Sequence, residues 1–250
     1  MSGHSKWSQI KRQKGANDAK RGAVFTKLGR EITIAARAGG GDPDANYRLR
    51  LAIEKARAEN MPADNIKRAI ERATGGAAAD QYEEMVYEGY GPGGVAILVE
   101  AATDNRNRTA ADVRAMFTKN GGQLAGAGAV AWQFEPRGVV AVSRNGHDAD
   151  DVALAAIDAG ADDVDTDGDP IEVVTDPAHL EQLRKTLEGA GMPIESAEVT
   201  MHAKTPIEVG EHVARQNLRL IEALEDLDDV QRVTANFDLP AELLAEAASV

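Results

Sequence analysis

The stretch that decides the fold is 138-GVVAVSRNGHDADDVALAAIDAGADDVDTDGDPIEVVTDPAHLEQLRKTLEGAGMPIESAEVTMH-202. Short β-branched runs alternate here with amphipathic runs that are long enough for helices. The predicted elements, in order, are a strand at 138–142, a helix at 149–159, a strand near 162–166, a strand at 171–175, a helix at 177–190 and a strand at 194–201. The order βαββαβ is that of a complete ferredoxin-like unit.

The same kind of pattern is incomplete on either side of this unit. Before it, the predicted elements are strands near 84–88 and 95–101, a helix at 107–119 and a strand at 130–135. In the last strand Val130, Trp132 and Phe134 alternate with small or polar residues. After it come a helix at about 211–226 and a strand near 230–236. Because the middle unit is already closed, we expect the C-terminal elements to complete the first sheet.

Residues 17–75 predict three helices, because apolar residues recur there at helical spacing. The first covers about 17–38, the second opens at Asp42-Pro43 as N-cap and first helical residue, and the third opens at Pro62. The predicted fold class is α+β, with an N-terminal three-helix domain followed by two ferredoxin-like α/β domains, the third inserted in the second. The predicted domains are 1–78, 79–136 plus 204–250, and 137–203.

Composition limits the classes of function. The chain has no cysteine, which excludes disulfides, thiolate zinc sites and a cysteine nucleophile. Met1–Lys14 is polar and basic, without the apolar core of a signal peptide, and no apolar run has the length of a membrane span. We therefore expect a cytoplasmic protein.

Catalytic and metal-binding patterns are also missing. The five histidines are scattered without metal-ligand spacing, and no serine lies in a nucleophile-elbow pattern. Asp163, Asp165, Asp167 and Gly168 match half of a calcium loop, but its twelfth position is Val174 instead of glutamate. The sequence predicts no enzyme, no cofactor, no metal site and no small-molecule substrate. A metal-dependent enzyme remains the alternative of another class.

Charge is divided unevenly along the chain. Residues 1–75 hold sixteen Lys and Arg against eight Asp and Glu, a net charge of +8, whereas residues 76–250 carry −21. Basic side chains gather most densely in the first thirty residues, around a single acid, Asp18. These candidate nucleic-acid-binding residues are Lys6, Lys11, Arg12, Lys14, Lys20, Arg21, Lys27 and Arg30. Such residues replace condensed counterions on a phosphate backbone, which predicts a nucleic-acid partner but does not distinguish DNA from RNA.

Three further segments admit a binding and a structural interpretation. Tyr90 lies in the glycine run Gly89–Gly94, where its ring could stack on a base, although a tight hairpin loop is the favoured explanation of the glycines. Arg106 and Arg108 follow a strand at a helix start, where they could hold a phosphate or pair with acids of the same body. The third helix carries Asn65, Lys67, Arg68 and Arg72, but nothing separates them from ordinary surface residues.

Several long motifs, in the same order, resemble the YebC family of probable transcriptional regulators, which includes the mitochondrial translational activator of cytochrome c oxidase. The resemblance covers nearly the whole chain. Its motifs are Ser2–Trp7, Ile10-Lys11, Asn60–Pro62, Asn65-Ile66, Tyr87–Gly94, Thr103–Thr109, Gly121-Gly122 and Leu227–Val230. One departure is Ala129, where the family usually has a serine.

The resemblance implies three domains, with the third inserted in the second, and a non-enzymatic regulator. Family members are described as DNA-binding regulators of transcription, and others as ribosome-bound factors that help translation through proline-rich stretches. We therefore expect a DNA-binding transcriptional regulator. The alternative is a ribosome-associated translation factor that binds ribosomal RNA.

Overall fold

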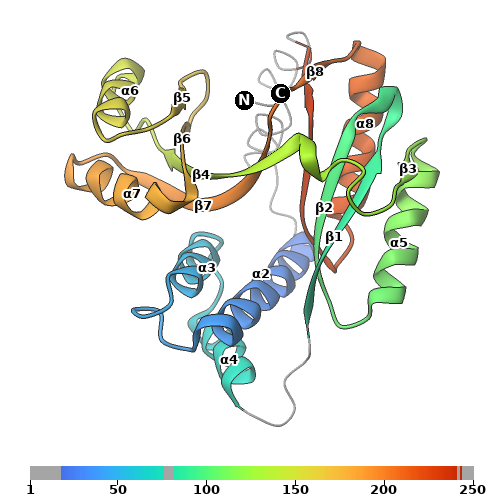
Figure 1. Cartoon of the computed structure of the whole chain (residues 1–250). Helices are drawn as coiled ribbons and strands as arrows, with labels where there is room; N and C mark the ends of the chain where they lie inside the picture. Colours follow the sequence, from blue (N-terminus) through green and yellow to red (C-terminus); the bar gives the residue numbers. More distant parts are fainter. Residues whose placement is uncertain (1–17, 76–81, 241–242, 244–250) are drawn as a thin grey trace. The chain divides into compact units, whose positions relative to one another are not determined.

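The computed structural model describes residues 18–75, 82–240 and 243 (Figure 1). The first described range, 18–75, contains three helices. They are α2 (Asp18–Gly39), α3 (Tyr47–Ala58) and α4 (Ala63–Thr74). Their apolar faces meet in one aliphatic core, as the helical spacing predicts. This core consists of Leu28, Ile32, Ala35, Ala36, Leu49, Ala52, Ile53, Ala56, Met61, Ile66 and Ala69.

The start predicted for the second helix is wrong. Asp42 accepts a hydrogen bond from the Asp44 N–H at 3.0 Å, which makes a local turn, and α3 begins only at Tyr47. The buried Asn46 is the cap: its Oδ1 accepts from the Leu49 N–H at 3.1 Å, while its Nδ2 donates to the Ala35 carbonyl at 2.8 Å. Asn46 therefore starts one helix and ties it to the end of the previous one.

A four-stranded antiparallel sheet follows, with the order β3–β1–β2–β9. Its strands are β1 (Glu83–Tyr90), β2 (Ala96–Thr103), β3 (Gln123–Leu124) and β9 (Val230–Ala235). Two helices, α5 (Arg106–Lys119) and α8 (Glu211–Glu225), pack on one face of the sheet (Figure 1). Because β9 pairs with β2, the predicted return of the C-terminal segment to the first sheet is confirmed.

The stretch 138–202 has the predicted βαββαβ order. Its elements are β4 (Phe134–Val142), α6 (Ala149–Asp158), β5 (Asp163–Asp165), β6 (Ile171–Thr175), α7 (Leu180–Gly189) and β7 (Ile194–Ala203). The strands lie in the order β5–β6–β4–β7, which is the ferredoxin-like arrangement. The α+β fold class is therefore confirmed. A short parallel pair, β8 (Ile207–Glu208) and β10 (Phe237–Asp238), completes the elements.

The strand predicted at 130–135 is wrong. Residues Ala131–Gln133 form a 3₁₀ turn instead, and β4 begins at Phe134. The cause is the buried carboxylate of Glu88, which accepts the N–H groups of Gly128, Val130 and Ala131 at 2.6, 2.7 and 2.8 Å. Burial alone would raise the pKa of Glu88, but these three bonds lower it.

The glycine run Gly89–Gly94 begins within β1, and residues 91–95 form the tight connection between β1 and β2. Gly93 has a φ of +76°, which favours glycine. A Cβ at Gly91 would lie 2.0 Å from Oδ1 of the buried Asn217. Close packing and backbone conformation therefore explain these glycines without a ligand.

Two compact units make up the chain: one holds Glu135–His202, and the other holds the residues up to Phe134 together with those from Ala203 on. The three N-terminal helices and the antiparallel sheet belong to the same unit. The division into three domains at the boundaries given above stays a prediction. Across the described ranges, no helix has the length and apolar character needed to cross a membrane.

Candidate nucleic-acid interface

The predicted basic residues fall into two groups. Lys6, Lys11, Arg12 and Lys14 lie outside the described residues, and the side chains of Lys20 and Arg21, in the first turn of α2, are outside them as well. The remaining two, Lys27 and Arg30, lie further along α2. Their side chains contact the acidic segment Glu225–Asp229, which comprises the last residue of α8 and the connection to β9.

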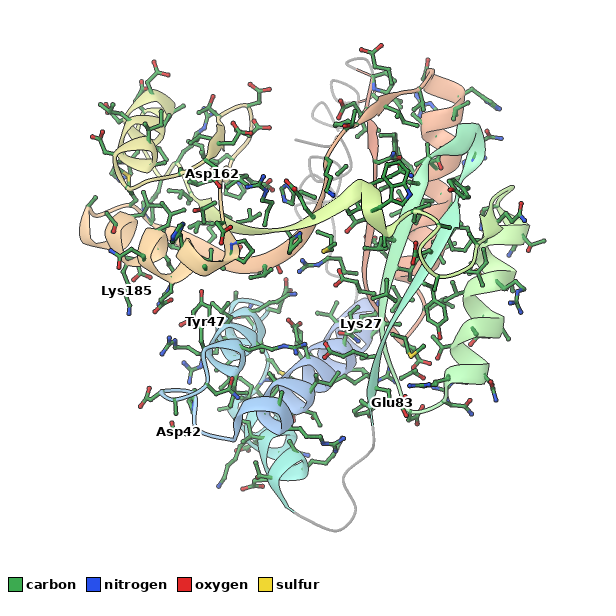
Figure 2. All side chains as sticks on the ribbon, viewed as in Figure 1. Lys27, Asp42, Tyr47, Glu83, Asp162 and Lys185 are labelled. Atoms are coloured by element: carbon green, nitrogen blue, oxygen red, sulfur yellow. The ribbon has the colours of Figure 1, made fainter. Side chains whose placement is uncertain are left out.

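Lys27 is turned toward that acidic segment (Figure 2). Its Nζ donates to the carbonyl oxygen of Glu225. Burial lowers the pKa of Lys27, and the charges of Glu225, Asp226 and Asp228 oppose that effect. Lys27 therefore has its hydrogen bond and its charge partners within the protein.

The Arg30 guanidinium has several contacts within the protein. Its Nη1 lies 2.7 Å from Oδ1 of Asp229 and 2.5 Å from the carbonyl oxygen of Asp228. The guanidinium carbon lies 5.3 Å from the ring centre of Tyr82, which is cation–π distance. The Arg30 side chain is only 13% exposed, so this pairing fixes its direction.

Asp229 collects donors from three separate parts of the chain. In addition to Arg30, its carboxylate accepts from Thr109 Oγ1 at 2.6 Å, Arg108 Nη2 at 2.8 Å and Thr103 Oγ1 at 3.3 Å. Burial would raise the pKa of Asp229, but the hydrogen bonds from Thr109 and Arg108 and the charges of Arg30 and Arg108 lower it. The group is thus a buried carboxylate held in its charged form.

Arg106 and Arg108 are both paired with acids among the described residues. Arg106 Nε pairs with Glu83, and Arg108 pairs with Asp104 at 2.7 Å as well as with Asp229. Hydrogen bonds to Asp229 and Asp104 raise the pKa of Arg108. Asn105 caps α5 by accepting from the Arg108 N–H at 3.1 Å. This geometry favours the structural interpretation, while a phosphate site here stays a prediction.

Tyr90 ends β1 and is 38% exposed. Its hydroxyl donates to the Ala129 carbonyl at 3.0 Å, and Trp132 Nε1 donates to the same oxygen at 3.1 Å. Trp132, which the alternation had placed in a strand, is 67% exposed. The ring of Tyr90 is thus anchored at its hydroxyl, and base stacking on it is untested.

A second basic cluster contains two arginines of the third helix that the sequence offered as possible groove readers, but their meeting with Arg30 and Tyr82 was not predicted. Arg30, Arg68, Arg72 and Tyr82 line one cavity between α2 and α4. The arginines of α4 looked like ordinary surface residues, and Tyr82 carried no signal in the sequence. Only the packing of the two helices could reveal that these side chains meet.

Replacing Asp229 by asparagine tests the buried network. Above pH 5 we expect Asp229→Asn to lower the free energy of unfolding by about 3 kcal/mol, because Arg30 loses its buried partner. Since the folded pKa is lowered, this stabilisation is present above the unfolded pKa of about 3.9 and disappears as the pH falls through the folded pKa. Urea unfolding between pH 2 and 7 measures the difference.

Asp228→Asn is the matched control, because its side chain is exposed one residue away. It should change the free energy of unfolding by less than about 0.5 kcal/mol at each pH. Equal effects of the two substitutions, or an Asp229→Asn effect that is constant down to pH 2, would contradict the network.

Comparisons with known proteins agree with the fold. Residues 5–76 match the TACO1/YebC protein N-terminal domain, and residues 82–237 match the TACO1/YebC second and third domain. A relative from Chloroflexus aurantiacus is 57% identical over 98% of both chains. One from Rubrobacter xylanophilus is 55% identical over 99% of this chain and 100% of its own. Both are named probable transcriptional regulatory protein.

A solved structure is similar as well. The crystal structure of a conserved hypothetical protein from Aquifex aeolicus has a TM-score of 0.86 and 45% sequence identity, and the match covers 91% of this chain and 94% of that one. The matches to both family domains and the full-length relatives lead to the same assignment. This chain belongs to the TACO1/YebC family.

Proposed function

We propose that this protein is a non-enzymatic regulator of transcription that binds DNA and acts in the cytoplasm. The observation that carries the proposal is the charge division, +8 over residues 1–75 against −21 over the rest. A basic segment attracts phosphates, whereas acidic surfaces elsewhere are repelled by them. The protein therefore meets DNA with its N-terminal residues. The names of the relatives support a regulatory role.

The basic segment from Lys6 to Arg21 is the part that we assign to DNA. Lys27 and Arg30 are engaged by Glu225 and Asp229, so they are less suited to bind phosphate from solution. Six basic residues precede them: Lys6, Lys11, Arg12, Lys14, Lys20 and Arg21. Binding through such residues needs no cofactor or metal ion, and our proposal includes none.

The second candidate is a ribosome-associated translation factor that binds ribosomal RNA. One observation favours it: Pro62 lies where α4 begins, instead of the glycine-containing turn that is common in helix-turn-helix proteins. Aromatic and arginine side chains near irregular structure suit RNA, whose unstacked bases accept stacking. Both candidates use the same basic segment, so the partner has to be identified directly.

Replacing basic residues of the segment from Lys6 to Arg21 by alanine tests the proposed DNA contact. For a wild-type protein with about five phosphate contacts, log K should fall against log salt with a slope of about −4.5 on duplex DNA. In the full chain with Lys11, Arg12 and Lys14 replaced by alanine, the slope should become shallower by about 3. Fluorescence anisotropy over a series of NaCl concentrations measures both.

The matched control replaces Arg114, Lys119 and Arg219, which are exposed in α5 and α8, and so removes the same charge. Its slope should stay within about 1 of the wild type. A flat salt response of the wild type, or equal effects of the two triple variants, would refute the assignment.

Crosslinking in growing cells, followed by sequencing of both DNA and RNA, decides between the two candidates. The proposed function predicts discrete peaks near promoters. Footprints on ribosomal RNA near the peptidyl-transferase region, without promoter peaks, would replace it with the translation factor. The Tyr90→Ala variant adds a control, because slower synthesis of proline-rich proteins with unchanged promoter occupancy would also favour translation.

A further inference from the structure

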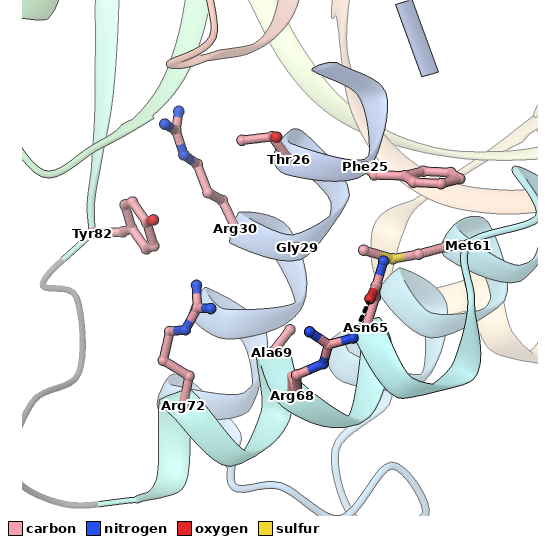
Figure 3. Close-up of a pocket in the computed structure, with 10 residues that line it drawn as sticks. All are labelled: Phe25, Thr26, Gly29, Arg30, Met61, Asn65, Arg68, Ala69, Arg72 and Tyr82. Atoms are coloured by element: carbon pink, nitrogen blue, oxygen red, sulfur yellow. Dashed lines mark hydrogen bonds between the residues drawn. The ribbon is translucent and has the colours of Figure 1, made fainter. Parts of the chain in front are cut away.

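The groove between α2 and α4 differs in charge from its surroundings. It has a volume of about 260 Å³, and its charged lining residues are Arg30, Arg68 and Arg72. Among the described residues, no Asp or Glu lines it. Figure 3 shows Arg72 rising from α4 toward Arg30 and Tyr82, with Arg68 on the next turn. Three arginine side chains thus line one groove.

The structure gives the hydrogen-bond partners of two of these arginines, Arg68 and Arg30. Arg68 Nε donates to the Asp64 carbonyl at 3.1 Å and its Nη2 to Asn65 Oδ1 at 2.9 Å, and neither acceptor is charged. Arg30 binds Asp229 through Nη1, whereas its buried Nε has no hydrogen-bond partner in the part of the chain that the structure describes. Among the described residues Arg68 thus has no carboxylate partner, and an anion in the groove would supply one for its charge.

A neighbouring cavity provides the contrast. It shares Arg30, has a volume of about 520 Å³ and also contains Arg108, but five aspartates line it as well. They are Asp104, Asp112, Asp226, Asp228 and Asp229. This cavity therefore repels an anion, and the same charges hold Arg30 in place at the border of the groove. Of the two spaces, only the α2–α4 groove has the charge to accept a phosphate.

Aromatic side chains complete the lining. Tyr82 and Phe25 contribute rings at the two sides of the groove (Figure 3). Arginine planes and aromatic rings together are the groups that hold an unstacked base and its phosphate. The volume lies just below the range of about 300–1,000 Å³ that is typical of sites for free small molecules, which suits one unit of a longer polymer.

We propose that the groove between α2 and α4 binds one unpaired nucleotide of a single-stranded nucleic acid, with Arg68 and Arg72 on its phosphate and Tyr82 against its base. This inference rests on the proposed function, because it adds a second contact with the nucleic acid to the one that we assign to the basic segment from Lys6 to Arg21. Arg30 is a positioning residue, since Asp229 directs it toward Tyr82. A base inside a regular duplex is stacked and cannot enter the groove.

The test uses the full chain and two fluorescein-labelled probes, a 12-nucleotide oligo(dT) and a 12-base-pair duplex. Arg68→Ala with Arg72→Ala should weaken oligo(dT) binding more than about tenfold, because two charge-assisted contacts are lost. Arg57→Ala with Lys67→Ala is the matched control: Arg57 on α3 and Lys67 on α4 are both exposed outside the groove, and the charge change is identical. The control should weaken binding less than about threefold.

Tyr82 separates stacking from charge. Tyr82→Ala should weaken oligo(dT) binding roughly tenfold, whereas Tyr82→Phe, which keeps the ring, should stay within about twofold of wild type. Duplex binding should change less than about threefold in all groove variants. Thermal unfolding checks the fold of each, and Arg68→Gln alone replaces the double variant if that variant melts early.

The outcomes separate this inference from the proposed function. If the wild type binds neither probe, the proposed function fails and the groove assignment fails with it. If the wild type binds but the groove variants match the Arg57/Lys67 control, only the groove assignment is overturned. Equal losses on duplex and oligo(dT) also overturn it, because they indicate a general loss of phosphate attraction.

Discussion

The buried carboxylate of Asp229 is the constraint on which the attachment of α2 to the antiparallel sheet depends. It accepts from Arg30 on α2, from Thr103 at the end of β2, and from Arg108 and Thr109 on α5. A charge removed from water is stable only while its donors stay in place. One short segment after α8 therefore joins α2 to the antiparallel sheet, and the direction of Arg30 follows from it.

This constraint divides the basic residues by role. Lys27 and Arg30 are used by the acidic segment at Glu225–Asp229, so part of the charge cluster that suggested nucleic acid serves the fold. Arg68 has only neutral acceptors among the described residues and lines the groove. The net charge of a segment indicates a polyanion partner, but hydrogen-bond partners decide which of its side chains can reach it.

Local patterns were enough to predict much of the fold. Helical spacing gave the three N-terminal helices, and alternating strand and helix signals gave the βαββαβ unit, because both depend on residues close in sequence. The errors came from distant polar partners. Glu88 accepts backbone N–H groups between residues 128 and 131, so this segment forms a turn instead of the predicted strand. Asn46, bound to Ala35, caps the second helix, which therefore begins later than the Asp-Pro pair had predicted.

The residues of the candidate site were harder to predict from the sequence for the same reason, because distant parts of the chain bring them together. Arg30 and Asp229 are 199 positions apart, and Tyr82 reaches Arg30 only through tertiary packing. The central claim is that nucleic acid binds to the helical N-terminal part and not to the acidic inserted unit. Amide ¹H–¹⁵N spectra of the full chain, titrated with the 12-nucleotide oligo(dT), test it most directly. The account predicts that the largest shifts fall in α2 and α4, with α6 and α7 unchanged; shifts concentrated in residues 135–202 would contradict it.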